Sequence, residues 1–131
     1  TMFYDFAVTI PANTTKASPM EEKVWLSHGI IHRVAVEFPP GCAKLAHMTI
    51  CDGLHQVWPT NPDGSFASDS HTIMFDEFYP MEQAPYTLTL TAWNLDDSYP
   101  HTITVRFGLL PRWTLIPFKV MRGVTKLLGG G

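Results

Sequence analysis

The side chains with the widest chemical range in this chain are its six histidines, because imidazole can ligate a metal or move a proton near neutral pH. None of them pairs as HxH, and no CxxC or similar zinc-ligand spacing is present. His32 and His47 would face each other if their strands were neighbours, but we expect ordinary cross-strand histidines there and no metal. The six are His28, His32, His47, His55, His71 and His101.

Carboxylates cluster at Asp76-Glu77 and at Asp96-Asp97. Glycoside hydrolysis needs two carboxylates about 5–10 Å apart. Neighbouring residues on a strand point to opposite faces, so Asp76 and Glu77 cannot form that pair with each other. Asp96 and Asp97, together with Asn94, offer oxygen ligands of the kind that calcium prefers. Their spacing is irregular, however, and we expect a solvated acidic loop.

Signatures of a catalytic nucleophile or of a phosphate-binding loop are absent. The chain has no GxSxG elbow, no cysteine beside a histidine and no dinucleotide-binding fingerprint. We therefore expect no catalytic residue, no cofactor and no bound metal, and we predict that the protein is not an enzyme.

Aromatic residues suggest contacts instead of catalysis. Trp25, Trp58 and Trp93, with Tyr79 and Tyr99, are candidates for a platform on which a carbohydrate stacks. Strand alternation places Trp93 on the face opposite the core, where an exposed tryptophan usually marks a contact. Three alternatives remain open for it: a sugar, a covering segment or neighbouring subunit, or a loop of its own domain.

Eight apolar-alternating runs, separated by Pro, Gly, Asn or Asp turns, must position these side chains. Their spacing predicts an all-β protein, an antiparallel eight-stranded β-sandwich that is jelly-roll-like, because βαβ units would need helical segments between the strands. The predicted strands are Phe3–Ile10, Glu21–Leu26, Ile30–Phe38, Lys44–Cys51, Leu54–Trp58, His71–Tyr79, Tyr86–Asn94 and His101–Leu109.

Cys42 and Cys51 are the only cysteines. On one extended run they would lie about 25–30 Å apart, beyond disulfide reach. We expect two free thiols, which favours a reducing compartment of synthesis. Residues 1–10 are strand-like and lack the features of a signal peptide, so none is expected. No apolar run approaches the ~18 residues of a membrane span.

The pattern changes after Pro111, so the chain divides into a sandwich domain at residues 1–111, here called the body, and a basic amphipathic docking segment at residues 112–131, here called the C-terminal segment. Pro117 can open a helix, and apolar residues then recur at helical spacing beside three bases. A helix this short is marginal alone, so the segment, helical or extended, should need a partner surface. The expected partner-binding residues are Trp93, Trp113, Lys119, Val120, Met121, Arg122, Val124, Lys126, Leu127 and Leu128.

Charge is divided between the same two parts. The body holds all 12 acids and five bases, so its formal net charge is 5 − 12 = −7, whereas the C-terminal segment holds four bases and no acid, +4. An acidic body is a poor nucleic-acid binder, because affinity there rests on neutralising phosphates. The basic segment suits an acidic protein surface, such as a neighbouring copy of the body.

The body contains four distinctive sequence motifs: YDFAVTIP at 4–11, FPPGC at 38–42, WPTNPDGS at 58–65 and HTITVRFG at 101–108. In this order of motifs the chain resembles small accessory structural proteins of tailed bacteriophages, especially capsid decoration (cement) proteins with a jelly-roll-like body. The resemblance spans residues 3–111 and carries over no functional residue. It implies a virion component that is assembled in the host cytoplasm.

We therefore expect a non-enzymatic structural or assembly protein, such as a capsid decoration protein, that forms a homo-oligomer or binds a larger protein shell. The alternative is a carbohydrate-binding or adhesion module that uses exposed tryptophans. The detached basic segment favours the first function, because a monomeric sugar binder does not need it.

Overall fold

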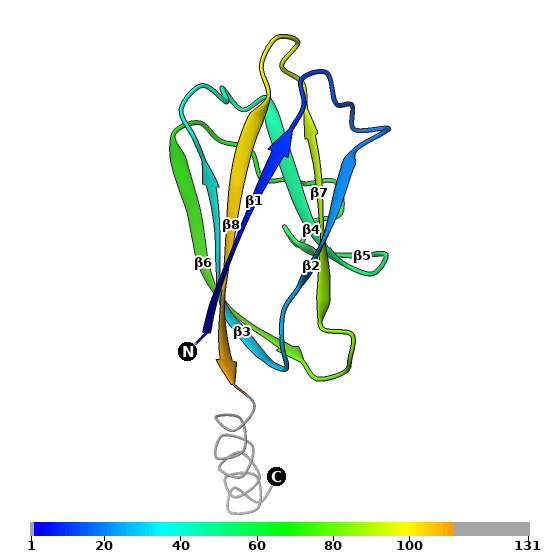
Figure 1. Cartoon of the computed structure of the whole chain (residues 1–131), viewed down its shortest axis with the longest axis vertical. Coiled ribbons are helices and arrows are strands. Elements are labelled where there is room, and N and C mark those ends of the chain that lie inside the picture. The colour runs from blue at the N-terminus through cyan, green and yellow to red at the C-terminus, as the bar shows by residue number, and fades with distance from the viewer. Residues whose placement is uncertain (1, 112–131) are drawn as a thin grey trace, which may run out of the picture.

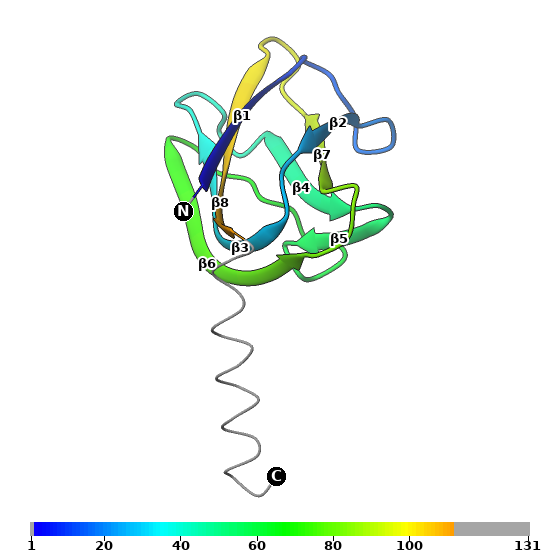
Figure 2. The ribbon, with the colours of Figure 1, turned by 60° about the horizontal axis from the view of Figure 1, so that its bottom comes forward.

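Residues 2–111 are described in the computed structural model and form two packed four-stranded antiparallel sheets (Figures 1 and 2). The predicted fold class is confirmed, and each predicted strand is present with small shifts at its ends. Residues 112–131, which include Trp113 and the predicted stripe from Val120 to Leu128, lie outside the described residues. The strands are β1 (Met2–Ile10), β2 (Met20–Trp25), β3 (Gly29–Phe38), β4 (Ala46–Asp52), β5 (His55–Trp58), β6 (His71–Met81), β7 (Thr87–Asn94) and β8 (His101–Pro111).

The strand pairing is that of a long hairpin that has been rolled up. β1 pairs with β8, β2 with β7, β3 with β6, and β4 with β5, all antiparallel. Rolling this hairpin places β3 beside β8 and β4 beside β7. The resulting sheets have the orders β1-β8-β3-β6 and β2-β7-β4-β5, which makes the sandwich a jelly roll.

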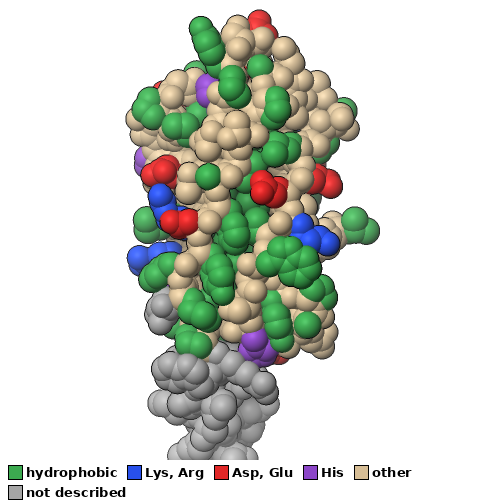
Figure 3. All heavy atoms as spheres, viewed as in Figure 1, with side chains coloured by type: hydrophobic (Ala, Val, Ile, Leu, Met, Phe, Trp, Pro, Cys, Tyr) green, Lys and Arg blue, Asp and Glu red, His purple; other side chains and the backbone are tan. Residues whose placement is uncertain are grey.

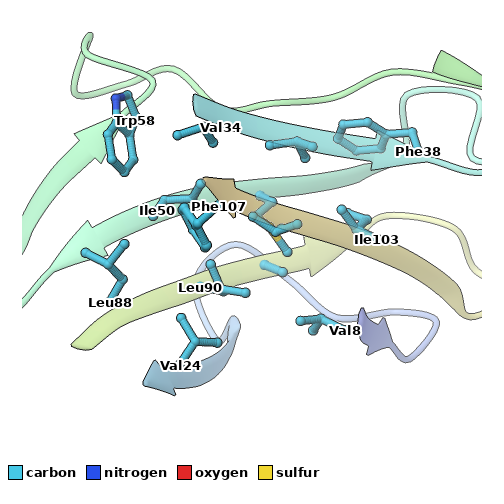
Figure 4. Close-up of a cluster of buried hydrophobic side chains, with 14 of the residues drawn as sticks. Val8, Val24, Val34, Phe38, Ile50, Trp58, Leu88, Leu90, Ile103 and Phe107 are labelled. Atoms are coloured by element: carbon cyan, nitrogen blue, oxygen red, sulfur yellow. The ribbon is translucent and has the colours of Figure 1, made fainter. Parts of the chain in front are cut away.

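The core lies between the inward faces of the two sheets (Figure 4). The alternation predicted for β7 and β8 is confirmed, because every second side chain of these central strands is fully buried. Apolar burial of this kind is the main favourable term in folding. Fully buried side chains include Phe38, Ile50, Leu88, Leu90, Ile103, Val105, Phe107 and Leu109.

β3 departs from the simple alternation that its sequence predicts. The register against both β6 and β8 shifts between Ile31 and Arg33, which marks a β-bulge. Ile31 consequently joins Val34 in the core, whereas His32, predicted to share a face with Val34, lies beside the ring of Phe3 at 6.4 Å between centroids. The prediction that His32 shares a face with Val34 was wrong, because a β-bulge cannot be recognised from the alternation of polar and apolar residues.

The contribution of an aromatic side chain to the free energy of unfolding should depend on whether it is buried in this core. Phe107 is fully buried, whereas Phe3 is 66% exposed on the outer face of the same sheet. We expect Phe107→Ala to lower the free energy of unfolding by about 3–5 kcal/mol, since it removes buried surface and leaves a cavity. The matched Phe3→Ala control should cost far less. Urea denaturation measures both, and equal losses would contradict the core described here.

Candidate functional site

β1 and β2 lie at the same margin of the two sheets, and each has only one strand partner. Several core-facing side chains at this margin are only partly buried and pack against the core. In Figure 3, hydrophobic side chains form a column between these two strands, with acidic groups beside it. This surface, here called the open edge, consists of Met2, Tyr4, Phe6, Met20 and Leu26.

Contacts within the open edge hold its aromatic rings in place. The rings of Tyr4 and Phe6 stack nearly parallel, with centroids 6.3 Å apart, and Phe6 packs against Phe107 of the core at 6.2 Å. The hydroxyl of Tyr4 donates a hydrogen bond of 2.9 Å to Oγ of Ser27, which follows β2. The apolar surface is therefore preorganised, and a partner would lose little side-chain entropy from these rings on binding.

Acidic side chains flank the open edge. Glu21 and Glu22 lie on β2, are exposed, and make no ion pair or hydrogen bond through their side chains among the described residues. Asp5 on β1 differs, because Arg106 lies 3.3 Å from its carboxylate and also reaches Glu37 at 3.5 Å. Glu22, on the core-facing side of β2, is therefore a carboxylate at the open edge with no ion-pair partner among the described residues, whereas Glu21 shares the outer face of β2 with Lys23.

The opposite edge of the sandwich, between β5 and β6, is closed by side chains. Nε1 of Trp58 donates a hydrogen bond of 2.9 Å to Oε2 of Glu77, and the hydroxyl of Tyr79 donates one of 2.6 Å to Oδ2 of Asp52. The indole hydrogen bond lowers the pKa of Glu77, and the backbone N–H of Phe78 adds to this. Burial and the Asp52 carboxylate raise the pKa of Tyr79 to about 12. Each bond joins one sheet to the other.

Trp93 lies on the face opposite the core, as predicted, but it is only 6% exposed. Its ring stacks on His47 at 5.3 Å and lies under the ammonium group of Lys16 at 5.5 Å. Burial lowers the pKa of His47, and the Lys16 charge lowers it further. The expectation that Trp93 is exposed to a partner is thus corrected: its own domain covers it, and alternation along β7 carries no information about a covering loop.

Of the other aromatic residues grouped from the sequence, Trp58 and Tyr79 pack edge to face with ring centroids 5.3 Å apart, whereas Trp25 and Tyr99 lie elsewhere. Trp58 is 3% exposed, whereas Trp25 is 63% exposed and lies beside Lys23, whose ammonium group is 5.9 Å from the ring centroid. Tyr99 is also exposed, but it lies in the loop between β7 and β8. The tryptophans that the sequence grouped together therefore have separate environments.

His32 and His47 do not face each other, because β3 and β4 belong to different sheets. The cross-strand prediction assumed that strands consecutive in sequence pair, and the rolled hairpin separates this pair. No three or more of the described His, Cys, Asp and Glu side chains come together in a way that could hold a metal.

Asp96 is the centre of an ordered turn, not of the solvated acidic loop that the sequence predicts. Its Oδ1 accepts hydrogen bonds from the backbone N–H groups of Ser98 and Tyr99, and its Oδ2 lies 2.8 Å from Nε2 of His101. Its own N–H donates to Oδ1 of the buried Asn94. The Ser98 and His101 hydrogen bonds lower the pKa of Asp96. These carboxylate oxygens are already engaged inside the chain.

The cysteine prediction is confirmed, since Cys42 and Cys51 are both free. Burial raises the pKa of the Cys42 thiol, and the nearby carboxylates of Asp69 and Asp96 raise it further. This favours the neutral, unreactive thiol. Among residues 2–111 no helix is long and apolar enough to cross a membrane.

The open edge was not identified from the sequence, although Tyr4, Phe6 and Leu26 lie in predicted strands. One signal was present: Glu22 occupies a core-facing position in the alternation that contains Val24. A carboxylate is rarely buried without a partner, so its presence there indicates a place where the two sheets do not meet.

No protein-family model matches this chain, and no curated protein matches its sequence. Any function must therefore be argued from the geometry and charge of the molecule itself.

The Asp96 turn should make stability depend on pH. A carboxylate whose pKa is lowered by folding stabilises the folded state above its unfolded pKa, and this is lost as the pH falls through the folded value. We expect Asp96→Ala to lower the urea midpoint at pH 7, with the difference from wild type narrowing below about pH 4. The exposed neighbour Asp97 supplies the control Asp97→Ala, which should stay near wild type throughout. A difference that is independent of pH would contradict this account.

Proposed function

We propose that this protein is a non-enzymatic assembly protein, a virion component such as a capsid decoration protein, whose C-terminal segment binds the body of a neighbouring copy. The observation that carries the proposal is the opposite charge of the two parts, −7 for residues 1–111 and +4 for residues 112–131. At the open edge, carboxylates without an ion-pair partner among the described residues lie beside partly buried apolar side chains. Such a surface is complementary in charge and polarity to the basic, amphipathic segment.

The apolar stripe supplies most of the expected affinity. Each large apolar side chain contributes about 1.5–3 kcal/mol when it is fully buried. Ordering the segment and losing the freedom of one subunit offset much of this, so association depends on several stripe residues together. The bases Lys119, Arg122 and Lys126 mainly steer and orient the segment.

The jelly-roll fold is compatible with this function but does not select it, because both viral capsid proteins and lectins use the fold. The motif order that resembles phage decoration proteins favours the capsid function. A carbohydrate-binding module would need an exposed aromatic platform, and the burial of Trp58 and Trp93 removes two of the three tryptophans that were candidates for one.

Substitution in the stripe should separate assembly from folding. In the full-length protein, Val124→Asp places a charge in the apolar stripe and should reduce the mass measured by light scattering to that of a monomer. Thr125→Asp adds the same charge at the next position, outside the stripe, and should leave the mass unchanged. Raising the salt concentration should weaken association less than Val124→Asp does, because apolar burial is not screened.

Circular dichroism of the same variants provides the folding control. Both should retain the β-sandwich spectrum of the wild type. If Val124→Asp instead unfolds a monomer, the segment belongs to the core of its own domain and the assembly function is wrong.

A further inference from the structure

We propose that the open edge between β1 and β2 is the surface that receives the C-terminal segment of a second copy of this chain. This inference rests on the proposed function and names the receiving surface on the body. It follows from three properties of the described residues: accessible core side chains, unpaired carboxylates and the place where the described chain ends.

The first property is accessibility of the core. Two hydrogen bonds between side chains, Trp58 to Glu77 and Tyr79 to Asp52, close the β5–β6 edge. At the β1–β2 edge the hydroxyl of Tyr4 donates a hydrogen bond to Oγ of Ser27 just after β2, yet five apolar side chains along this edge remain only partly buried. An amphipathic segment laid along this edge would complete the burial that the two sheets leave unfinished.

The second property is charge. Glu22 alternates with Val24 on the core-facing side of β2, whereas its neighbour Glu21 points to the outer face, on the same side as Lys23. A base brought to this position would pair with a carboxylate next to apolar surface, where attraction is screened less than in open water. The C-terminal segment carries bases beside its apolar stripe and no acid that would oppose them.

The third property is where the described chain ends. β8 is the direct neighbour of β1, and Leu109 pairs with Met2 at the beginning of the open edge. The segment therefore starts near one end of the receiving surface. In the sequence, Pro111 and Pro117 bracket a five-residue link, and each proline biases the residue before it towards extended backbone. We place the segment on a second copy because the proposed function is self-association.

The test is a charge reversal in the full-length protein. Glu21→Lys/Glu22→Lys should weaken self-association at least tenfold, as measured by light scattering over a range of protein concentrations. The control Asp63→Lys/Asp97→Lys makes the same change in net charge at two exposed acids that lie in loops away from β2. It should associate as the wild type does.

Mixing two variants tests whether the contact forms between copies. One carries the reversed edge, Glu21→Lys/Glu22→Lys, and the other a reversed segment, Lys119→Glu/Arg122→Glu/Lys126→Glu. Each alone should be monomeric, because its edge and segment then have the same sign. An equal mixture should regain association, since each variant offers the surface that the other lacks.

The outcomes separate this inference from the function on which it rests. If Val124→Asp dissociates the protein but the reversed edge does not, the segment binds elsewhere on the body: the open edge is wrong and the assembly function stands. If both reversed variants are monomeric and their mixture remains so, the receiving surface is not on a second copy. A wild type that is monomeric at all concentrations would overturn both proposals.

Discussion

The fold depends on the burial of the inward apolar faces of the two sheets against each other. This burial is more complete in the central strands than at the margins of the sandwich. The central strands β8, β3, β7 and β4 bury most of their inward side chains, because each has a strand on both sides and a sheet opposite. At the margins the sheets must be joined by side chains or left apart. One margin is closed by an indole and a phenol that donate to carboxylates of the opposite sheet. At the other margin the hydroxyl of Tyr4 donates to Ser27 just after β2, and the apolar side chains along β1 and β2 are only partly buried.

Most of the fold could be predicted from local pattern alone. The alternation of Leu88 and Leu90 with threonines, and of Ile103, Val105 and Phe107 with polar residues, identifies both strand and buried face. Turn residues such as Asp52-Gly53 separate the strands, and Gly53 has the positive φ of 61° that such a turn requires. These features depend on residues that are neighbours in the sequence, so one sequence by itself contains the information needed to recognise them.

Features that depend on how partners are placed in space could not be predicted in the same way. The environment of Trp93 is set by Lys16 and by His47, which come from other parts of the chain. The Asp96 turn is recognisable only when His101 and the backbone of Ser98 are placed around its carboxylate. The open edge likewise requires the knowledge that β1 and β2 lie at the same margin of two different sheets. For Trp93 and the open edge the missing information is the arrangement of strands, which alternation does not specify; for Asp96, whose partners are only two and five residues away, it is the conformation of the turn.

The two free carboxylates of β2 have a consequence for solubility. An edge strand presents unpaired backbone groups to any other strand, and charged side chains on it are a common protection against aggregation. If two identical open edges approached each other, Glu21 and Glu22 of one molecule would meet the same acids of the other, and like charges would oppose the contact. A basic strand or helix would meet no such repulsion. In the binding mode proposed above, these acids would oppose contact between two identical edges, while the apolar surface would remain accessible to a basic segment.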